Sequence, residues 1–594
     1  ERPMMPYLKN KMQRTARSIS KFDGLNMNLA KADNELSDDC NMSSDNYPCL
    51  SVRAPRNDCD NLGMTVRAMG VKDGIFCVGS TEDETDKTII KFGENTAEIS
   101  SGNPSAERQC ACLSDQVLIM PDKTVYKPSD NSVYHVAYSK TITLAGAEET
   151  AKKQLGASYT TNFPTYIGEI TSKGLVSASY TDKYVAYLMP FEEIKAGDVV
   201  HISMDVLPSP YNKTNYWSYI DAMNEGFDLK IESVTYTNHD IKGSTLNEIT
   251  AINFGENAID MGGFTEVIIK SITLSRRLPD LDDMCSLNNR IWGVKGNTIS
   301  CCKLGDATQW YDFSADSYGT LPSSCFSADV DTGGKFTAVT SFGGGIIAFK
   351  EECIHKIYGN APDNYTLSTL ECNGVKDGAR DTLCRVGGAL YYMGRGGVYM
   401  YDGTRPRLIS QKTDLDIADA KWAGTDGKKY YLLAGALSGR RIYVYDPERK
   451  SWHMEDMPEN ADRFVCYDGR LYLLCGSVLK CISGDKSAQE SVTWSFTLHF
   501  DEDSYATKNY DKLFIKYKLG EDAAFTVKTV CDGDRQNCGI YSDASGGDVE
   551  YATAVLPIRR CIEFELLFSG AGEFSLIDVT REFFVTSAKR VVNS

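Results

Sequence analysis

A pair of apolar strands joined by a short turn recurs along this chain, and the spacing of the pairs limits how it can fold. Seven such pairs begin near positions 74, 116, 290, 345, 389, 430 and 470. Most steps between them are about 40–44 residues, the repeat length of four-stranded β-propeller blades. The runs are rich in Tyr, Val, Ile and Phe, and Gly or Asp at the turns supplies the positive φ angles that tight hairpins need. One blade cannot bury both of its faces, whereas blades stacked around an axis can.

Two steps depart from this spacing. The step of about 55 residues from position 290 needs only a longer loop, whereas the step of about 174 residues from position 116 needs an inserted domain. We therefore predict an all-β chain: a six- to seven-bladed β-propeller with an inserted small β-barrel-like domain and a C-terminal β-sandwich. An irregular array of β-sandwiches is the alternative. The predicted domains are a basic N-terminal arm (1–24), the first part of the propeller (25–144), the inserted β domain (145–275), the second part of the propeller (276–487) and the C-terminal β-sandwich (488–594).

The regions outside the repeat also show strand patterns. Apolar and polar residues alternate in 198–203 and 265–270 of the insertion, and five or more strands follow position 490 within about 100 residues. The aromatic run 216–220 is interpreted mainly as core, with a contact surface as the alternative. The segment from Leu25 to Val52 is a candidate for the strand that closes the ring against the last blade.

The charge of the chain bears on its partners. The net charge is −18, which disfavours general binding of nucleic acid because phosphates are held by Lys and Arg, although an acidic wall would let DNA slide past. Residues 1–21 carry several Lys and Arg side chains without the apolar run of a secretory signal, so we interpret them as a docking arm or a solvated tail. No apolar run is long enough for a membrane-spanning helix.

The 19 cysteines include no CxxC pair with metal-binding spacing. Most lie inside apolar runs, where a thiol behaves as a small hydrophobe. In the absence of an export signal we expect reduced thiols and synthesis in a cytosol. A zinc site is the disfavoured alternative.

Catalytic motifs are not evident. HExxH, GxSxG, a Walker A loop and a strand–GxGxxG–helix unit are all missing, and the glycines 343–345 precede a strand. The carboxylates most open to a paired role lie at predicted turns, where Asp is favoured for backbone reasons, yet a glycosidase dyad stays open. The candidates are Asp329, Asp331, Asp402 and Asp446. The calcium-loop fragments 329–334 and 532–534 are interpreted as ordinary turns.

Histidines complete this survey, and a structural role is favoured for those within strand patterns. They are His135, His201, His239, His355, His453 and His499. We therefore predict no catalytic residue, no cofactor and no metal ligand, and a protein that is not an enzyme.

Three segments resemble one protein family. The opening 22–56 contains a Gly-Leu-Asn start at Gly24 and ends in a Leu50-x-x-Arg53-x-x-Arg56 strand. The segments 288–313 (NNRIWGVKGNTISCCKLGDATQWYDF) and 387–410 (GGALYYMGRGGVYMYDGTRPRLIS) are similar in kind. Together they resemble the tail hub and nozzle proteins of short-tailed phages, also called packaged-DNA-stabilisation or head-closure proteins. The resemblance covers about two thirds of the chain and leaves the insertion and the C-terminal region unmatched.

The resemblance implies a structural virion protein made in the host bacterial cytoplasm. Such a subunit forms an oligomeric ring below the portal, with six copies as one candidate number. The ring retains and conducts genomic DNA without sequence-specific binding. Its implied partners are portal or adaptor proteins and tail fibres or spikes. A receptor- or glycan-binding propeller adhesin is the alternative function, followed by a propeller glycosidase.

Overall fold

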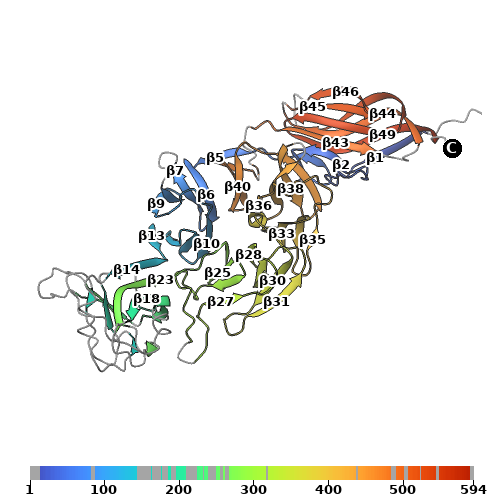
Figure 1. Ribbon diagram of the computed structural model, residues 1–594. Helices are drawn as coiled ribbons and strands as arrows, with labels where there is room; N and C mark the ends of the chain where they lie inside the picture. Colours follow the sequence, from blue (N-terminus) through green and yellow to red (C-terminus); the bar gives the residue numbers. More distant parts are fainter. Residues whose placement is uncertain are drawn as a thin grey trace, which may run out of the picture. The chain divides into compact units, whose positions relative to one another are not determined.

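The computed structural model consists almost entirely of β-strands (Figure 1). It describes residues 14–81, 87–143, 162–163, 175–176, 185–188, 196–208, 224–231, 233–237, 249–253, 259–260, 267–315, 319–436, 439–482, 484, 490–500, 506–521, 523–542 and 548–588. A short 3-10 helix lies at Arg380–Thr382. The described residues include no helix with the length and apolar character needed to cross a membrane. The all-β prediction is confirmed.

Two compact units make up the chain: unit 1 with residues 1–84, 349–354 and 370–594, and unit 2 with residues 85–348 and 355–369. Unit 1 contains three four-stranded sheets. The first is β32 (Cys384–Val386), β33 (Ala389–Gly394), β34 (Gly397–Tyr401) and β35 (Arg407–Leu408). The second is β36 (Trp422–Thr425), β37 (Tyr430–Ala436), β38 (Gly439–Asp446) and β39 (Ser451–Asp456). The third is β40 (Ala461–Tyr467), β41 (Arg470–Cys475), β42 (Val478–Cys481) and β5 (Asn57–Asn61).

Strand β5 completes the third of these sheets by pairing antiparallel with β42, far away in the sequence (Figure 1). The sequence points to Leu25–Val52 for a closing strand, whereas β2 (Leu36–Cys40), β3 (Met42–Ser43) and β4 (Leu50–Val52) join the C-terminal sheets instead. The reason is visible in the residues: β5 is exposed and polar, so its pattern carries no strand signal.

The C-terminal region forms two sheets over one core. One has the order β3-β4-β49-β44-β47, with β1 (Arg14–Ile19) also paired to β49, and the other has the order β2-β43-β48-β45-β46. Residues of β43 alternate strictly between buried and partly exposed, and their apolar side chains share a cluster with those of β44 and β49. The remaining strands are β43 (Thr493–Phe500), β44 (Ala506–Leu519), β45 (Ala524–Cys531), β46 (Asp534–Ser542), β47 (Val549–Cys561), β48 (Phe564–Ala571) and β49 (Phe574–Ala588).

Unit 2 contains two further sheets of four consecutive strands. They are β10 (Gln109–Leu113), β11 (Gln116–Met120), β12 (Thr124–Lys127) and β13 (Ser132–His135), and β24 (Asp283–Leu287), β25 (Arg290–Lys295), β26 (Thr298–Cys301) and β27 (Phe326–Asp329). The last two sheets with this order are β6 (Met64–Val71), β7 (Ile75–Thr81), β8 (Thr88–Phe92) and β9 (Asn95–Ile99), and β28 (Ala338–Phe342), β29 (Gly345–Phe349), β30 (Cys353–Tyr358) and β31 (Thr366–Glu371). Within the described residues, seven four-stranded sheets thus correspond to the seven repeated pairs.

The inserted region begins with β14 (Tyr138–Thr143), which pairs with β23 (Val267–Arg276) in a sheet with β18 (Val199–Pro208) and β19 (Phe227–Lys230). A second sheet and a two-stranded pair accompany it. They contain β16 (Leu175–Val176), β17 (Val185–Leu188), β21 (Ile249–Asn253) and β20 (Ser233–Thr237), and β15 (Asn162–Phe163) with β22 (Ile259–Asp260). Much of the predicted domain 145–275, including the aromatic run 216–220, lies outside the described residues, as do residues 1–13 of the predicted arm.

A buried polar cluster fixes the base of the insertion within unit 2. Asp198 lies in the turn before β18 and is 1% exposed. Its carboxylate accepts hydrogen bonds from the Arg276 guanidinium (3.0 Å) and from the Gln309 amide (2.7 Å). Arg276 also donates to the carbonyl of Val136 at 2.8 Å. Because a buried charge without partners is strongly unfavourable, this cluster holds β18 and β23 in one position against the loop after β26.

Candidate functional sites

The N-terminal segment of unit 1 crosses β39 and makes a buried network there. Asp39 of β2 is 1% exposed, and its carboxylate faces Nδ1 of His453 at 2.7 Å and accepts the amide of Met454 at 2.8 Å. Burial raises the pKa of Asp39 above its ordinary value, although the hydrogen bond with His453 opposes that shift. This pair fixes β2 to the outer strand of the sheet β36–β39.

Asn41 continues the network with three hydrogen bonds from one side chain. Its Oδ1 accepts from Nε of Arg53 (2.9 Å) and from the amide of Asp456 (3.0 Å), and its Nδ2 donates to the carbonyl of Thr493 (2.7 Å). The residue has a φ of +62°, a left-handed conformation that Asn tolerates better than most residues. Asn41 therefore joins the N-terminal segment, β39 and the first strand of the C-terminal sheets.

Arg53 and Arg56 supply the positive charges. The two terminal nitrogens of Arg53 contact the two oxygens of Glu490 at 3.0 and 2.9 Å, and Arg56 donates to Glu455 at 2.7 Å. Both arginine side chains are about 95% buried, with exposures of 4% and 5%. Burial would raise the pKa of Glu490, but hydrogen bonds from Arg53 and from the Arg56 amide outweigh it and lower that pKa.

The opening of the N-terminal segment fits tightly beside this network. The amide of Leu25 donates to the Trp452 carbonyl at 2.8 Å, and a Cβ on Gly24 would lie 2.8 Å from the same oxygen. With a φ of +82°, Gly24 also has a conformation that other residues rarely adopt. We call the whole set the polar joint; its members are Gly24, Asp39, Asn41, Arg53, Arg56, His453, Glu455, Asp456 and Glu490.

The charged groups of the polar joint are paired with one another. Bidentate Arg–carboxylate contacts, such as the one between Arg53 and Glu490, fix orientation as well as distance. A buried ion pair contributes little net stability compared with apolar packing, but it permits one geometry only. The joint therefore links the sheet β36–β39 to the C-terminal sheets through buried hydrogen bonds and ion pairs.

The histidines in the described residues each have a polar neighbour. His355 is fully buried between the hydroxyls of Thr332 and Thr369, at 3.0 Å from each. The other contacts are His135 with Thr124, His201 with Asp228, His453 with Asp39, and His499 with Glu565. His239 lies outside the described residues.

The carboxylates that sequence reasoning left open as a dyad are placed at turns or strands, and Asp446 also accepts the hydroxyl of Ser44 at 2.6 Å. Asp402 accepts the amide of Thr404 at 3.0 Å, and Asp446 accepts the amide of Glu448 at 2.9 Å. Asp329 accepts the hydroxyl of Thr298 at 2.5 Å, and Asp331 is exposed in the loop that follows. The glycines 343 and 344 have φ angles of +60° and +77° directly before β29.

An aromatic pair with charged neighbours, of which Phe313 is exposed and Tyr311 partly buried, lies on unit 2. Phe313 is 49% exposed, and its ring meets that of Tyr311 edge-on at 6.3 Å. The guanidinium of Arg277 lies 4.6 Å above the Tyr311 ring and donates to Asp228, which also contacts His201 at 3.0 Å. An apolar ring bordered by hydrogen-bonding groups is typical of small-ligand binding surfaces.

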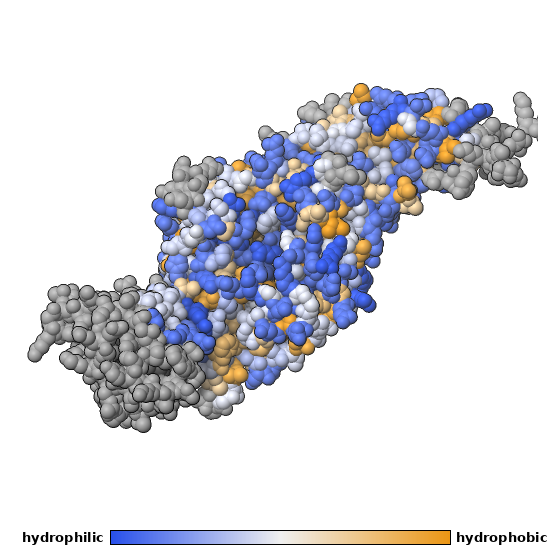
Figure 2. Space-filling view, viewed as in Figure 1, coloured by the Kyte–Doolittle hydropathy of each residue, from blue (hydrophilic) through white to orange (hydrophobic). Residues whose placement is uncertain are grey.

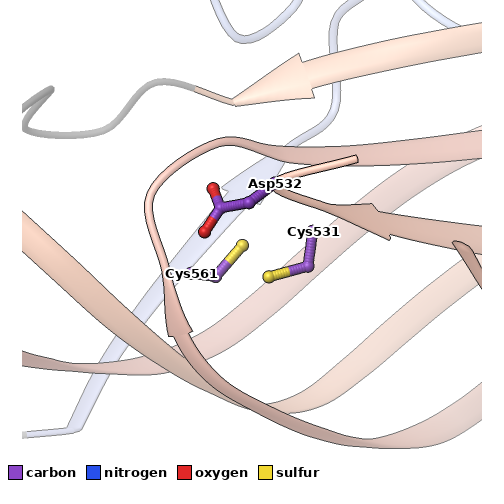
Figure 3. Close-up of side chains that lie close together, drawn as sticks. All are labelled: Cys531, Asp532 and Cys561. Carbon is purple, nitrogen blue, oxygen red and sulfur yellow. The ribbon is translucent and has the colours of Figure 1, made fainter. Parts of the chain in front are cut away.

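Two cysteines that sequence reasoning did not connect approach each other in the C-terminal sheets. Cys531 ends β45, Cys561 ends β47, and the ligand atoms of both and of Asp532 all lie within 4.8 Å of one another (Figure 3). Burial raises the pKa of both thiols. The expected turn at 532–534 is present: Asp532 and Gly533 have φ angles of +48° and +92°, and Cys531 pairs with Asp534. The two cysteines are 30 positions apart and belong to different sheets, so the sequence carries no signal for their contact.

No family model matches the chain, and no curated protein matches it. Solved structures are similar at low scores. BamB from Moraxella catarrhalis is 8% identical, with 74% of this chain and 99% of that chain covered and a TM-score of 0.28. PorZ, a surface component of the type-IX secretion system of Porphyromonas gingivalis, is 10% identical, with 91% and 81% covered and a TM-score of 0.24. An exo-β-1,3-galactanase from Phanerochaete chrysosporium is 11% identical, with 49% and 92% covered and a TM-score of 0.19.

Proposed function

We propose that this chain is a structural subunit of a bacteriophage tail, of the nozzle or hub type. In this proposal the seven four-stranded sheets that correspond to the repeat are the blades of a β-propeller, and the insertion is a small barrel-like domain. Several copies form a ring below the portal that retains and conducts DNA and anchors other tail parts. The subunit is made in the host bacterial cytoplasm, is not an enzyme and binds portal or adaptor proteins and tail fibres or spikes.

The observation that carries the proposal is the position of the opening segment, whose motif residues lie in the polar joint. Gly24, Arg53 and Arg56 belong to the first of the three segments on which the family resemblance rests, and all three lie in the polar joint. A subunit that transmits force between its domains needs a rigid coupling, because flexible connections would absorb the displacement. The motif residues thus serve mechanical coupling instead of a reaction.

The surface chemistry supports the same function. A net charge of −18 repels the phosphate backbone, so a lumen lined by this protein would pass DNA without holding it. The face drawn in Figure 2 is mostly hydrophilic, with hydrophobic residues scattered over it. Scattered apolar residues are ordinary for a soluble surface.

Light scattering coupled to size-exclusion chromatography, followed by negative-stain imaging of the purified full chain, tests the proposal. We expect a ring of several copies with a central channel under ionic conditions like those of a virion. A strictly monomeric particle under those conditions would contradict it.

The aromatic pair Tyr311 and Phe313 favours a second candidate, a glycan-binding or receptor-binding adhesin. Sugar rings stack on exposed aromatic faces, and Asp228 and Arg277 would bond their hydroxyls. A glycan array with the full chain tests this candidate. Tyr358, which is 42% exposed, serves as the control. Glycan binding that is lost in Phe313→Ala and kept in Tyr358→Ala would support the adhesin. Release of sugar by the pure protein would instead support a glycosidase.

A further inference from the structure

The end of the C-terminal sheets brings together three side chains with the chemistry of metal ligands. Cys531 belongs to the sheet that contains β45, and Cys561 belongs to the sheet that contains β47. Figure 3 shows both sulfur atoms and the carboxylate of Asp532 directed into the same space, and their ligand atoms lie within 4.8 Å of one another. Within the described residues, this is the one group in which three or more such side chains lie so close together.

Asp532 is held by backbone amides, with the shorter contacts on one of its two oxygens. Its Oδ1 accepts the amides of Ile562 (3.0 Å) and Glu563 (2.9 Å), whereas Oδ2 has a longer contact of 3.3 Å with the Ile562 amide. Metal-binding carboxylates and imidazoles are commonly oriented by such outer hydrogen bonds. The arrangement fixes the carboxylate beside the two sulfurs.

We propose that Cys531, Cys561 and Asp532 bind a divalent metal ion that prefers sulfur ligands, with Zn²⁺ as the commonest example. Zn²⁺ takes thiolate sulfur at about 2.3 Å and carboxylate oxygen at about 2.0–2.2 Å in a tetrahedron, so the ligand atoms would close by roughly 1 Å. Asp532 is exposed and Cys561 is buried, so the fourth position opens to water. The ion would clip the two sheets together at one end.

The charge balance at this place favours such a complex. Two thiolates, one carboxylate and one Zn²⁺ carry a net charge of −1. Lys508 is fully buried, lies opposite Cys561 in the strand register and donates to the Ile562 carbonyl at 3.4 Å. An anionic metal complex next to this ammonium group neutralises a charge that is otherwise unfavourable in the interior.

Two other interpretations of the cluster make different predictions. If the thiols serve only as core side chains, the Cys561 thiol simply donates to the Glu563 carbonyl at 3.0 Å and Asp532 is a turn residue. If the two sulfurs form a disulfide, oxidation by a disulfide or by oxygen removes two protons and two electrons and leaves no thiolate for a metal.

Titration of the full chain with Co²⁺, after removal of metals by a chelator under reducing conditions, decides between them. A tetrahedral cobalt–thiolate site has characteristic visible and near-ultraviolet bands, and we expect them to saturate at one equivalent and to disappear when Zn²⁺ is added. The double variant Cys531→Ser, Cys561→Ser should lose these bands. The matched double variant Cys110→Ser, Cys112→Ser, in which a cysteine pair of β10 is removed, should keep them.

Asp532→Asn separates binding from folding, because Asn tolerates the positive φ and its amide oxygen can still accept the backbone amides. We expect this variant to keep the circular dichroism of the parent and to bind Co²⁺ at least about tenfold more weakly. Bands that persist in the Cys531/Cys561 double variant, or an unaltered Co²⁺ affinity in Asp532→Asn, would overturn the proposal. So would the mass of a Cys531–Cys561 disulfide in protein isolated under reducing conditions.

Discussion

Arg53 shows how a single side chain can join segments that lie far apart in the sequence. Its guanidinium is 4% exposed and contacts Asn41, Asp456 and Glu490 at once, so removal of the side chain leaves several acceptors without their donor. Loss of one partner from a buried ion pair is far more destabilising than the net contribution of the pair itself, because the remaining charge stays buried.

Arg53→Met should therefore lower the free energy of unfolding of the region around the polar joint by about 3–5 kcal/mol. Differential scanning calorimetry measures this as a lower transition temperature. Arg407→Gln is the control: Arg407 pairs with Asp402 but is 66% exposed, and an exposed pair contributes at most about 1 kcal/mol. Equal, small effects of the two substitutions would argue against a tightly coupled joint.

Asp312 makes the stability of unit 2 depend on pH. It lies near Lys303 (2.6 Å) and Lys230 of β19 (3.1 Å), and it thereby ties the insertion to the loop after β26. Burial raises its pKa, but hydrogen bonds from Lys303 and Ser314 prevail and lower the pKa of Asp312 to about 2. Since the folded-state pKa lies below the ordinary value of 3.8, the stabilisation is present above about pH 4 and is lost as the pH falls toward 2.

Asp312→Asn should thus destabilise the protein near neutral pH by at most about 2 kcal/mol and have little effect near pH 2. Thermal unfolding of the parent and the variant between these limits gives the comparison. The two curves of melting temperature against pH should converge on the acid side. Parallel curves across the whole range would show that Asp312 does not contribute through its charge.

At the scale of the element, β5 illustrates a strand that is defined by its partner. Four of its five residues are exposed, so side-chain burial contributes little, and its pairing with β42 rests on backbone hydrogen bonds together with the exposed ion pair of Asp58 and Lys480. Proline removes the amide donor and is poorly tolerated in a paired strand.

Proline at positions 58, 59 and 60 together (Asp58→Pro, Cys59→Pro, Asp60→Pro) should release β5 from β42, because at least one of three consecutive amides faces the partner strand. Hydrogen exchange of the amides in β42 should then become faster. The control triple variant with Ser at the same positions removes the same side chains but keeps the amides, and its exchange should match that of the parent. Identical exchange in the two triple variants would mean that β5 is not needed to protect β42.

The sequence pattern located the inner strands of the repeated sheets but not their outer ones. The seven predicted starts coincide with the second strand of each sheet, as in β33 and β37, whose residues are mostly buried on both faces. Outer strands such as β31 and β5 are largely exposed and polar, so no apolar run marks them. Hydrophobic periodicity reports burial, and an edge strand held by backbone bonds alone is invisible to it.

Long-range contacts between polar residues were also beyond sequence reasoning. Asp39 and His453 are separated by more than 400 positions, and each reads locally as an ordinary strand residue. The same holds for Cys531 and Cys561, which the register of two different sheets brings together. These contacts can be recognised only when the fold shows which strands and strand ends are neighbours.

At the scale of the whole molecule, the net charge governs how copies of the chain would associate. Each copy carries −18 at neutral pH, so copies in a ring repel one another over distances set by the ionic strength. The screening length falls from about 30 Å in 0.01 M salt to about 8 Å in 0.15 M salt. If the ring of the proposed function is held by apolar and backbone contacts, added salt should favour it.

The oligomeric fraction, measured by sedimentation velocity at a fixed protein concentration, should therefore rise as NaCl increases from about 0.01 M to about 0.15 M. Sucrose at the same osmolality is the control, because it leaves the electrostatic repulsion in place. Dissociation with increasing salt would instead indicate that ion pairs between copies hold the ring. A chain that stays monomeric at every salt concentration would contradict the proposed ring, because the copies would then fail to associate even when their repulsion is screened.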